Sequence, residues 1–316
     1  MGVETATSAT IERAAKALAA GKLVAFPTET VYGLGADATN PDAVAQIYEV
    51  KGRPRFNPLI AHVSDRQMAE VHGIFDNVAN TLADAFWPGP LTLVLPKRGV
   101  SRICDLVSAG LDTVAVRIPS GDVAQELLRA AKCPVAAPSA NRAGHVSPTT
   151  AQHVADDLGE DIEVILDGGG TAHGLESTVI DCSGSRPLLL RPGVVSRTDI
   201  EGVLGMKLGK PTQNNQPVSP GQLASHYAPN SKVRLNAHDV QAGEALLAFG
   251  PDAPETNGPS INLSASGDLH EAAIRFFSAL RELDATACET IAVTPIPCEG
   301  LGEAMNDRLM RAAAPR

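Results

Sequence analysis

Apolar residues recur along this chain in two rhythms, which predict helices and strands. Over residues 10–20, Ile11, Ala14 and Leu18 fall on one helical face, and Gly21 follows as a stop. Short runs of apolar, often branched residues between turn-forming residues instead predict strands. Helices are expected at 10–20, 41–50, 65–72, 76–86, 121–131, 149–158, 268–283 and 301–313. Strands are expected at 22–26, 59–63, 91–95, 113–118, 134–137, 163–166, 178–181, 188–190, 233–235, 245–249 and 291–294.

The order of these elements predicts two α/β domains. Over residues 8–204 they interleave without strict β–α–β alternation, so we expect a mixed twisted sheet, not a Rossmann sheet. The pattern restarts over 231–316, which predicts a small α/β, Rossmann-like domain. Residues 205–230 carry four prolines and almost no periodicity, a composition that is typical of a linker.

Composition narrows the classes of function. The net charge of −10 over 316 residues argues against broad, stable binding of nucleic acid, which needs a basic surface. No apolar run approaches the ~18–20 residues of a membrane span, and the N-terminal residues do not resemble a signal peptide. The five cysteines show no C-x-x-C spacing, which suits reduced thiols and a cytoplasmic location.

The run from residue 26 to residue 62 places polar side chains after apolar strands, where α/β proteins bind their ligands. Within it, Lys51 and Arg53 belong to a basic Lys-Gly-Arg-Pro-Arg cluster that is suited to anions, because guanidinium matches phosphate oxygens and ammonium is a compact charge. Alternatively, these cations simply end a solvated helix, where they interact with its dipole. The first hypothesis is a phosphate-bearing small molecule.

Two later positions allow the same choice between structure and ligand binding. Arg117 stands in an apolar strand, where a buried, unpaired charge would be costly, so it either faces solvent or meets a fixed anion. Ser139 and Asn141 follow a strand, either as a plain turn or as a place where small residues let a ligand approach. The chain has no Walker A, G-x-S-x-G or H-E-x-x-H sequence.

Six ordered blocks carry a resemblance to a known family. They are PTETVYGLG at 27–35, KGRP with NPL at 51–59, SAN at 139–141, EST at 176–178, LRPG at 190–193, and SPG with HYAP at 219–229. The chain resembles the YrdC-type threonylcarbamoyl-AMP synthases, in their long two-domain form. The resemblance implies a YrdC-like domain with an open cavity. It also implies synthesis of threonylcarbamoyl-AMP and pyrophosphate from L-threonine, bicarbonate and ATP, for modification of tRNA next to the anticodon.

The resemblance also implies roles for individual residues. Lys51 and Arg53 would be catalytic. The implied ATP-binding residues are Lys51, Arg53, Asn57, Thr113, Ser139, Asn141, Ser147, Arg191 and Tyr227. The implied L-threonine-binding residues are Thr30, His62, Arg117, Ala137 and Ser177. Mg²⁺ would be held mainly by the ATP phosphates, with no protein metal site. A tRNA-modifying transferase would act downstream.

The connector and two alternative functions stay open at this point. We expect 205–230 to be an ordered lid over ATP, although 222–225 depart from the family's usual basic or aromatic stretch. One alternative is a non-catalytic RNA-binding module, which the acidity and scarce aromatic residues disfavour. The other is a carbamoyl transferase of the hydrogenase-maturation kind, whose additional segments are missing here. No nucleophile–base constellation stands out, which fits a reaction whose substrate supplies the nucleophile.

Overall fold

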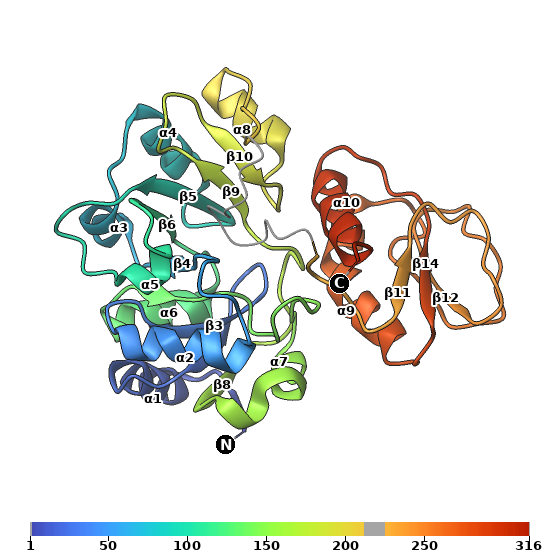
Figure 1. Cartoon of the computed structure of the whole chain (residues 1–316), viewed down its shortest axis with the longest axis horizontal. Helices are drawn as coiled ribbons and strands as arrows, with labels where there is room; N and C mark the ends of the chain where they lie inside the picture. The colour runs from blue at the N-terminus through green and yellow to red at the C-terminus, as the bar shows by residue number, and fades with distance from the viewer. Residues whose placement is uncertain (1, 212–224, 316) are drawn as a thin grey trace.

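The computed structural model describes residues 2–211 and 225–315, which form two α/β domains (Figure 1). The strands of the first domain are β1 (Val3–Thr5), β2 (Val24–Pro27), β3 (Tyr32–Asp37), β4 (Ile60–His62), β5 (Leu91–Pro96), β6 (Thr113–Arg117), β7 (Val135–Ala136), β8 (Val164–Asp167), β9 (Thr178–Asp181) and β10 (Leu188–Arg191). Its helices are α1 (Ser8–Ala19), α2 (Pro41–Lys51), α3 (Arg66–His72), α4 (Asn77–Phe86), α5 (Asp105–Ser108), α6 (Asp122–Ala131), α7 (Ala151–Leu158) and α8 (Arg197–Leu204), with a 3₁₀ turn at Gly159–Asp161.

The ten strands form one mixed sheet in the order β1-β8-β2-β3-β7-β4-β6-β5-β9-β10. β4 and β6 run parallel, whereas β2 with β3, β3 with β7, and β5 with β6 pair antiparallel. The predicted mixed sheet is therefore confirmed. In the register of β4 and β6, His62 lies beside Arg117, so both side chains project from the same face of the sheet.

Local sequence explains how α2 delivers the basic cluster. Asn40 caps the helix by accepting hydrogen bonds from the backbone N–H groups of Asp42 and Ala43, and proline stands at the first helical position. Gly52 ends the helix with a left-handed φ of 62°, a conformation that costs glycine little. The chain turns there, and Lys51 and Arg53 are both buried.

The C-terminal domain contains β11 (Lys232–Arg234), β12 (Glu244–Ala248), β13 (Ser260–Asn262), β14 (Thr290–Val293), α9 (Leu269–Asp284) and α10 (Leu301–Ala312). Its four strands are all parallel, in the order β11-β14-β12-β13. This confirms the predicted small α/β domain. In Figure 1, α9 and α10 lie on the side of this domain that faces the first domain.

One apolar cluster spans both domains. Val31, Val146 and Leu175 of the first domain belong to the same buried cluster as Phe276 and Phe277 of α9. Tyr227 joins it, with its ring 5.8 Å from the ring of Phe277 in a stacked arrangement. The two domains thus share part of a core.

β3 is the main element that sequence patterning missed, because its sequence YGLGAD holds two glycines. The structure explains them by close packing: a Cβ on Gly35 would lie 2.9 Å from both the Phe26 ring and a Val135 methyl group. The short elements β1, β13, α5 and α8 were also not predicted. Of the expected lid, residues 212–224, which include the SPG motif and 222–224, lie outside the described residues.

No helix in the described parts of the chain is long and apolar enough to cross a membrane.

Candidate active site

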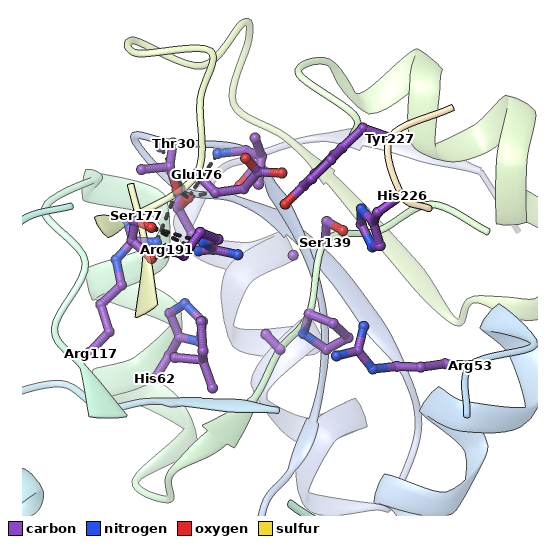
Figure 2. A pocket seen from close by; sticks show the side chains of 16 residues that line it. Thr30, Arg53, His62, Arg117, Ser139, Glu176, Ser177, Arg191, His226 and Tyr227 are labelled. Atoms are coloured by element: carbon purple, nitrogen blue, oxygen red, sulfur yellow. Dashed lines mark hydrogen bonds between the residues drawn. The ribbon is translucent and has the colours of Figure 1, made fainter. Parts of the chain in front are cut away.

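A cavity lined mostly by polar residues opens on the face of the large sheet that carries His62 and Arg117 (Figure 2). Figure 2 shows Arg117, Arg191 and Ser177 on one side of this hollow, with Arg53 and His226 across from them. The described residues that line it are Thr28, Thr30, Val31, Gly33, Arg53, Ile60, His62, Arg117, Ala137, Pro138, Ser139, Glu176, Ser177, Arg191, His226 and Tyr227.

The Arg117 guanidinium is fixed from three directions. It donates to Thr30 Oγ1 at 2.9 Å and to the Gly89 carbonyl at 3.2 Å, and its Nη2 lies 2.6 Å from a Glu29 carboxylate oxygen. Thr30 is itself held by the Thr28 hydroxyl at 2.7 Å. Arg117 is therefore a rigid, buried cation at the end of β6, not a solvent-facing one.

Glu29 compensates that buried charge. Burial alone would raise the pKa of its carboxyl, but the Arg117 guanidinium beside it outweighs burial and lowers the pKa. The pair is therefore ionised at neutral pH. Because a buried charge without a partner is strongly destabilising, Glu29 makes it possible for Arg117 to stay in the cavity wall before any ligand binds.

A second arginine lies on β10, the strand at one edge of the sheet. Arg191, at the end of β10, donates to the Ser177 carbonyl at 2.8 Å and to its hydroxyl at 3.1 Å. The hydroxyls of Ser177 and Thr92 lie 2.8 Å apart. Burial lowers the pKa of Arg191, but a guanidinium remains charged at any physiological pH. Ser177 thus has both its carbonyl and hydroxyl oriented before a ligand arrives.

The two cations Lys51 and Arg53 at the end of α2 make different contacts. Arg53 lines the cavity and donates to the carbonyls of Asn57 at 3.3 Å and Pro58 at 3.0 Å; burial lowers its pKa to about 10, so it remains charged. Lys51 does not line the cavity. Its ammonium donates to the carbonyls of Ser139, at 2.6 Å, and Asn141, so it holds their loop from behind.

Several buried polar atoms around the cavity have no hydrogen-bond partner among the described residues. They include both amide atoms of Asn57, the Asn141 Oδ1, and the Nδ1 atoms of His62 and His226. Buried polar groups in folded proteins are nearly always paired, so a cluster of unpaired ones indicates a place prepared for a polar ligand.

Both histidines of this cluster are held neutral. Burial and then the neighbouring Arg117 charge lower the pKa of His62 to about 3. Burial, followed by the charges of Arg53 and Lys51, lowers the pKa of His226 well below its ordinary value. At neutral pH each ring can therefore accept one hydrogen bond as well as donate one.

The cavity brings together most of the site residues predicted from sequence. Nine of them line it: Thr30, Arg53, His62, Arg117, Ala137, Ser139, Ser177, Arg191 and Tyr227. The remaining five are not among its described lining residues: Lys51, Asn57, Thr113, Asn141 and Ser147. Thr113 begins β6 and so lies four residues from Arg117 at the strand's other end, roughly 13 Å away at the rise of a strand. Their binding roles stay predictions.

Sequence reasoning did not assign roles to Glu29, Glu176 or His226, although all three stand inside the motifs. Glu176 lines the cavity and accepts a hydrogen bond from Ser147 at 2.7 Å. A signal was available for the two glutamates. Each stands next to apolar residues of a predicted strand, and an acidic side chain is rarely buried there without a partner.

The fold and the cavity define an α/β protein with three buried arginines around a cavity on one face of a mixed sheet. The Sua5–YciO–YrdC family model, described as telomere recombination, matches residues 16–193, and a model described as the threonylcarbamoyl-AMP synthase C-terminal domain matches residues 195–314. The chain therefore belongs to the Sua5–YciO–YrdC family, as an enzyme of the nucleotidyltransferase type.

Similar proteins extend over nearly the whole chain. A threonylcarbamoyl-AMP synthase of Bacillus subtilis is 40% identical over 97% of this chain and 93% of its own length. One of Pyrococcus abyssi is 41% identical over 94% and 92%. The crystal structure of P. abyssi Sua5 complexed with L-threonine superposes with a TM-score of 0.89 at 38% identity, covering 98% of this chain and 96% of that one. These similarities decide against the two alternative functions.

Proposed function

We propose that this chain joins L-threonine, bicarbonate and ATP into threonylcarbamoyl-AMP with release of pyrophosphate. The observation that carries the proposal is one cavity with three buried arginines and a set of unpaired polar atoms around it. Arginine is suited to both reactants, because its planar fork matches the oxygens of carboxylate and phosphate. The L-threonine bound to the P. abyssi relative and the names of the full-length relatives support it.

The chemistry does not require a nucleophile from the protein. The threonine amine adds to bicarbonate and water leaves, which gives a carbamate. A carbamate oxygen then attacks the α-phosphorus of ATP, and the bond from that phosphorus to pyrophosphate breaks. Because the substrate supplies the attacking oxygen, the protein must chiefly orient the reactants, neutralise charge and exclude water.

The positions of the arginines suggest a division of roles. Arg117, fixed beside Thr30, would hold the threonine carboxylate, and Ser177 would lie next to it. Arg53, across the cavity, would bind ATP phosphates, and Arg191, on the same side as Arg117, would reach the same phosphates. His62, neutral at the wall, can accept or donate a hydrogen bond to threonine without adding charge.

Magnesium enters this proposal only through ATP. Among the described residues, no group of three or more His, Cys, Asp or Glu side chains is placed to hold a metal ion. The one carboxylate among the described lining residues, Glu176, is already bound by Ser147 and Arg308. Phosphate oxygens and water would therefore hold the ion, whose charge would help to neutralise the triphosphate.

The product is a mixed anhydride and needs an acceptor. We propose that a downstream transferase moves the threonylcarbamoyl group to adenosine next to the anticodon of tRNA. The five cysteines, all free thiols in the structure, suit a reducing compartment, and we place the reaction in the cytoplasm.

The test is pyrophosphate release from the purified chain with ATP, L-threonine, bicarbonate and Mg²⁺, with each component omitted in turn. We expect release only when all four are present. Formation of ADP and phosphate, or pyrophosphate release that does not depend on threonine, would contradict an adenylate mechanism.

A further inference from the structure

Helix α10 presents an arginine in the middle of an apolar face. Its buried positions include Ala304, Met305, Leu309 and Ala312, as expected for a helix that docks on a core, and Arg308 among them is 0% exposed. Domain docking alone would be served by leucine at this position. Burying a guanidinium is costly unless it is paired and hydrogen-bonded, so its contacts indicate what it is for.

Those contacts lead from the C-terminal domain to the cavity wall. Arg308 Nε donates to Glu176 Oε2 at 3.1 Å, and its guanidinium carbon lies 5.2 Å from the centre of the Tyr227 ring. Glu176 and Tyr227 both line the cavity. Through its other oxygen, Glu176 accepts the hydrogen bond from Ser147 at 2.7 Å. Arg308 itself also donates to Asp307 at 2.8 Å.

Each of these contacts bears on a negatively charged ligand. Glu176 would repel phosphates if its charge were not neutralised from behind, and Arg308 does this without entering the cavity. Tyr227 has a left-handed φ of 62°, which is rare for a bulky residue and persists only where the surroundings fix it. The guanidinium on its ring is one such restraint.

We propose that Arg308 is a positioning residue through which the C-terminal domain sets the ATP-binding wall formed by Glu176 and Tyr227. The inference rests on the proposed function. It gives the C-terminal domain a defined role, because α10 orients one wall of the cavity, whereas the threonine corner at Arg117 and Thr30 is built entirely by the first domain.

The test compares Arg308→Met and Arg308→Lys with the wild-type chain, by ATP and threonine titration calorimetry and steady-state pyrophosphate release. The matched control is Arg197→Ala, which breaks another ion pair to α10, the contact with Glu303, away from the cavity. We expect Arg308→Met to weaken ATP binding at least about tenfold with a much smaller effect on threonine, and Arg308→Lys to be intermediate. The control should bind both ligands as the wild type does.

A double-mutant cycle with Glu176→Gln separates positioning from mere stability. Because Arg308 is proposed to act largely through Glu176, Arg308→Met should weaken ATP binding markedly less in the Glu176→Gln background than in the wild type. If Arg308→Met proves too unstable to purify, Arg308→Lys replaces it in the same double-mutant cycle with Glu176→Gln. Equal loss in both backgrounds, or ATP binding by the Arg308 variants equal to that of Arg197→Ala, would overturn the inference. A wild-type chain that binds ATP but releases no pyrophosphate would instead overturn the proposed function.

Discussion

At the residue scale, the cavity depends on cations that are fixed before any substrate binds. Arg117 is held by Glu29 and Thr30, Arg191 by Ser177, and Arg53 by backbone carbonyls. Such preorganisation means that little side-chain reorganisation is needed when a carboxylate or phosphate arrives. The sequence could show that these arginines stand near the ends of predicted elements, but the partners of Arg117 and Arg191 come from other parts of the chain.

We expect Arg53→Ala to weaken ATP more than threonine, and Arg117→Ala to do the reverse. The two guanidinium groups lie across the cavity from each other, so each should meet a different substrate. Loss of a desolvated, charge-assisted contact should cost roughly 2–4 kcal/mol. Titration calorimetry with each ligand measures this. Equal losses for both ligands in both variants would refute the division of roles.

The buried His62 should make the protein sensitive to acid. Its folded pKa is about 3, below the ordinary 6.5, so between these values the unfolded chain binds more protons and stability falls as pH falls. From pH 6.5 to 4.5 the wild type should lose about 2–3 kcal/mol more unfolding free energy than His62→Gln, which cannot titrate. Urea denaturation at the two pH values tests this, and parallel losses in both proteins would contradict it.

At the element scale, tight backbone approaches position the loops that bear the site. Gly193, just after β10, packs against the segment from Glu176 to Thr178 at the start of β9. In β3, the absence of a side chain on Gly35 similarly leaves room for the Phe26 ring to pack against the backbone. Helix and strand positions followed from periodicity and capping, but these approaches involve elements that are separated in sequence.

Gly193→Ala should weaken threonine binding by displacing the segment from Glu176 to Thr178 at the start of β9. The added Cβ would lie 2.5 Å from the Thr178 nitrogen and 2.6 Å from the Ser177 carbonyl carbon, so backbone would have to move. Such overpacking typically costs about 1–3 kcal/mol, and we expect a similar loss in threonine affinity. Gly170→Ala is the control, because a Cβ there meets nothing within 4 Å. Threonine binding that is unchanged in both variants would show that the segment tolerates displacement.

At the scale of the whole molecule, the two domains share apolar packing and ion pairs. Val31, Val146 and Leu175 pack in one cluster with the C-terminal domain, and Arg281 of α9 pairs with Asp157 of α7 at 2.7 Å. This packing brings Arg308 of the C-terminal domain, whose role the sequence could not indicate, against Glu176 and Tyr227 in the cavity wall.

Deletion of residues 205–316 should leave the first domain folded but much less active. The large sheet and its helices remain, whereas Tyr227 and Arg308 are lost and the apolar residues of the shared cluster become exposed. We expect lower stability in urea and pyrophosphate release reduced at least about tenfold, because one wall of the cavity is missing. Full activity of the truncated chain would show that the C-terminal domain is dispensable for the reaction.

The sequence alone determined the two-domain α/β plan, the mixed sheet, most helices and strands, and the family, because periodicity, capping and ordered motifs are properties of neighbouring residues. Nine of the site residues that the family resemblance implied line one cavity. Tertiary structure alone decided that Lys51 supports a loop and that Arg308 reaches Glu176 across 132 residues. Sheet order and domain docking set these contacts, and no local pattern encodes either.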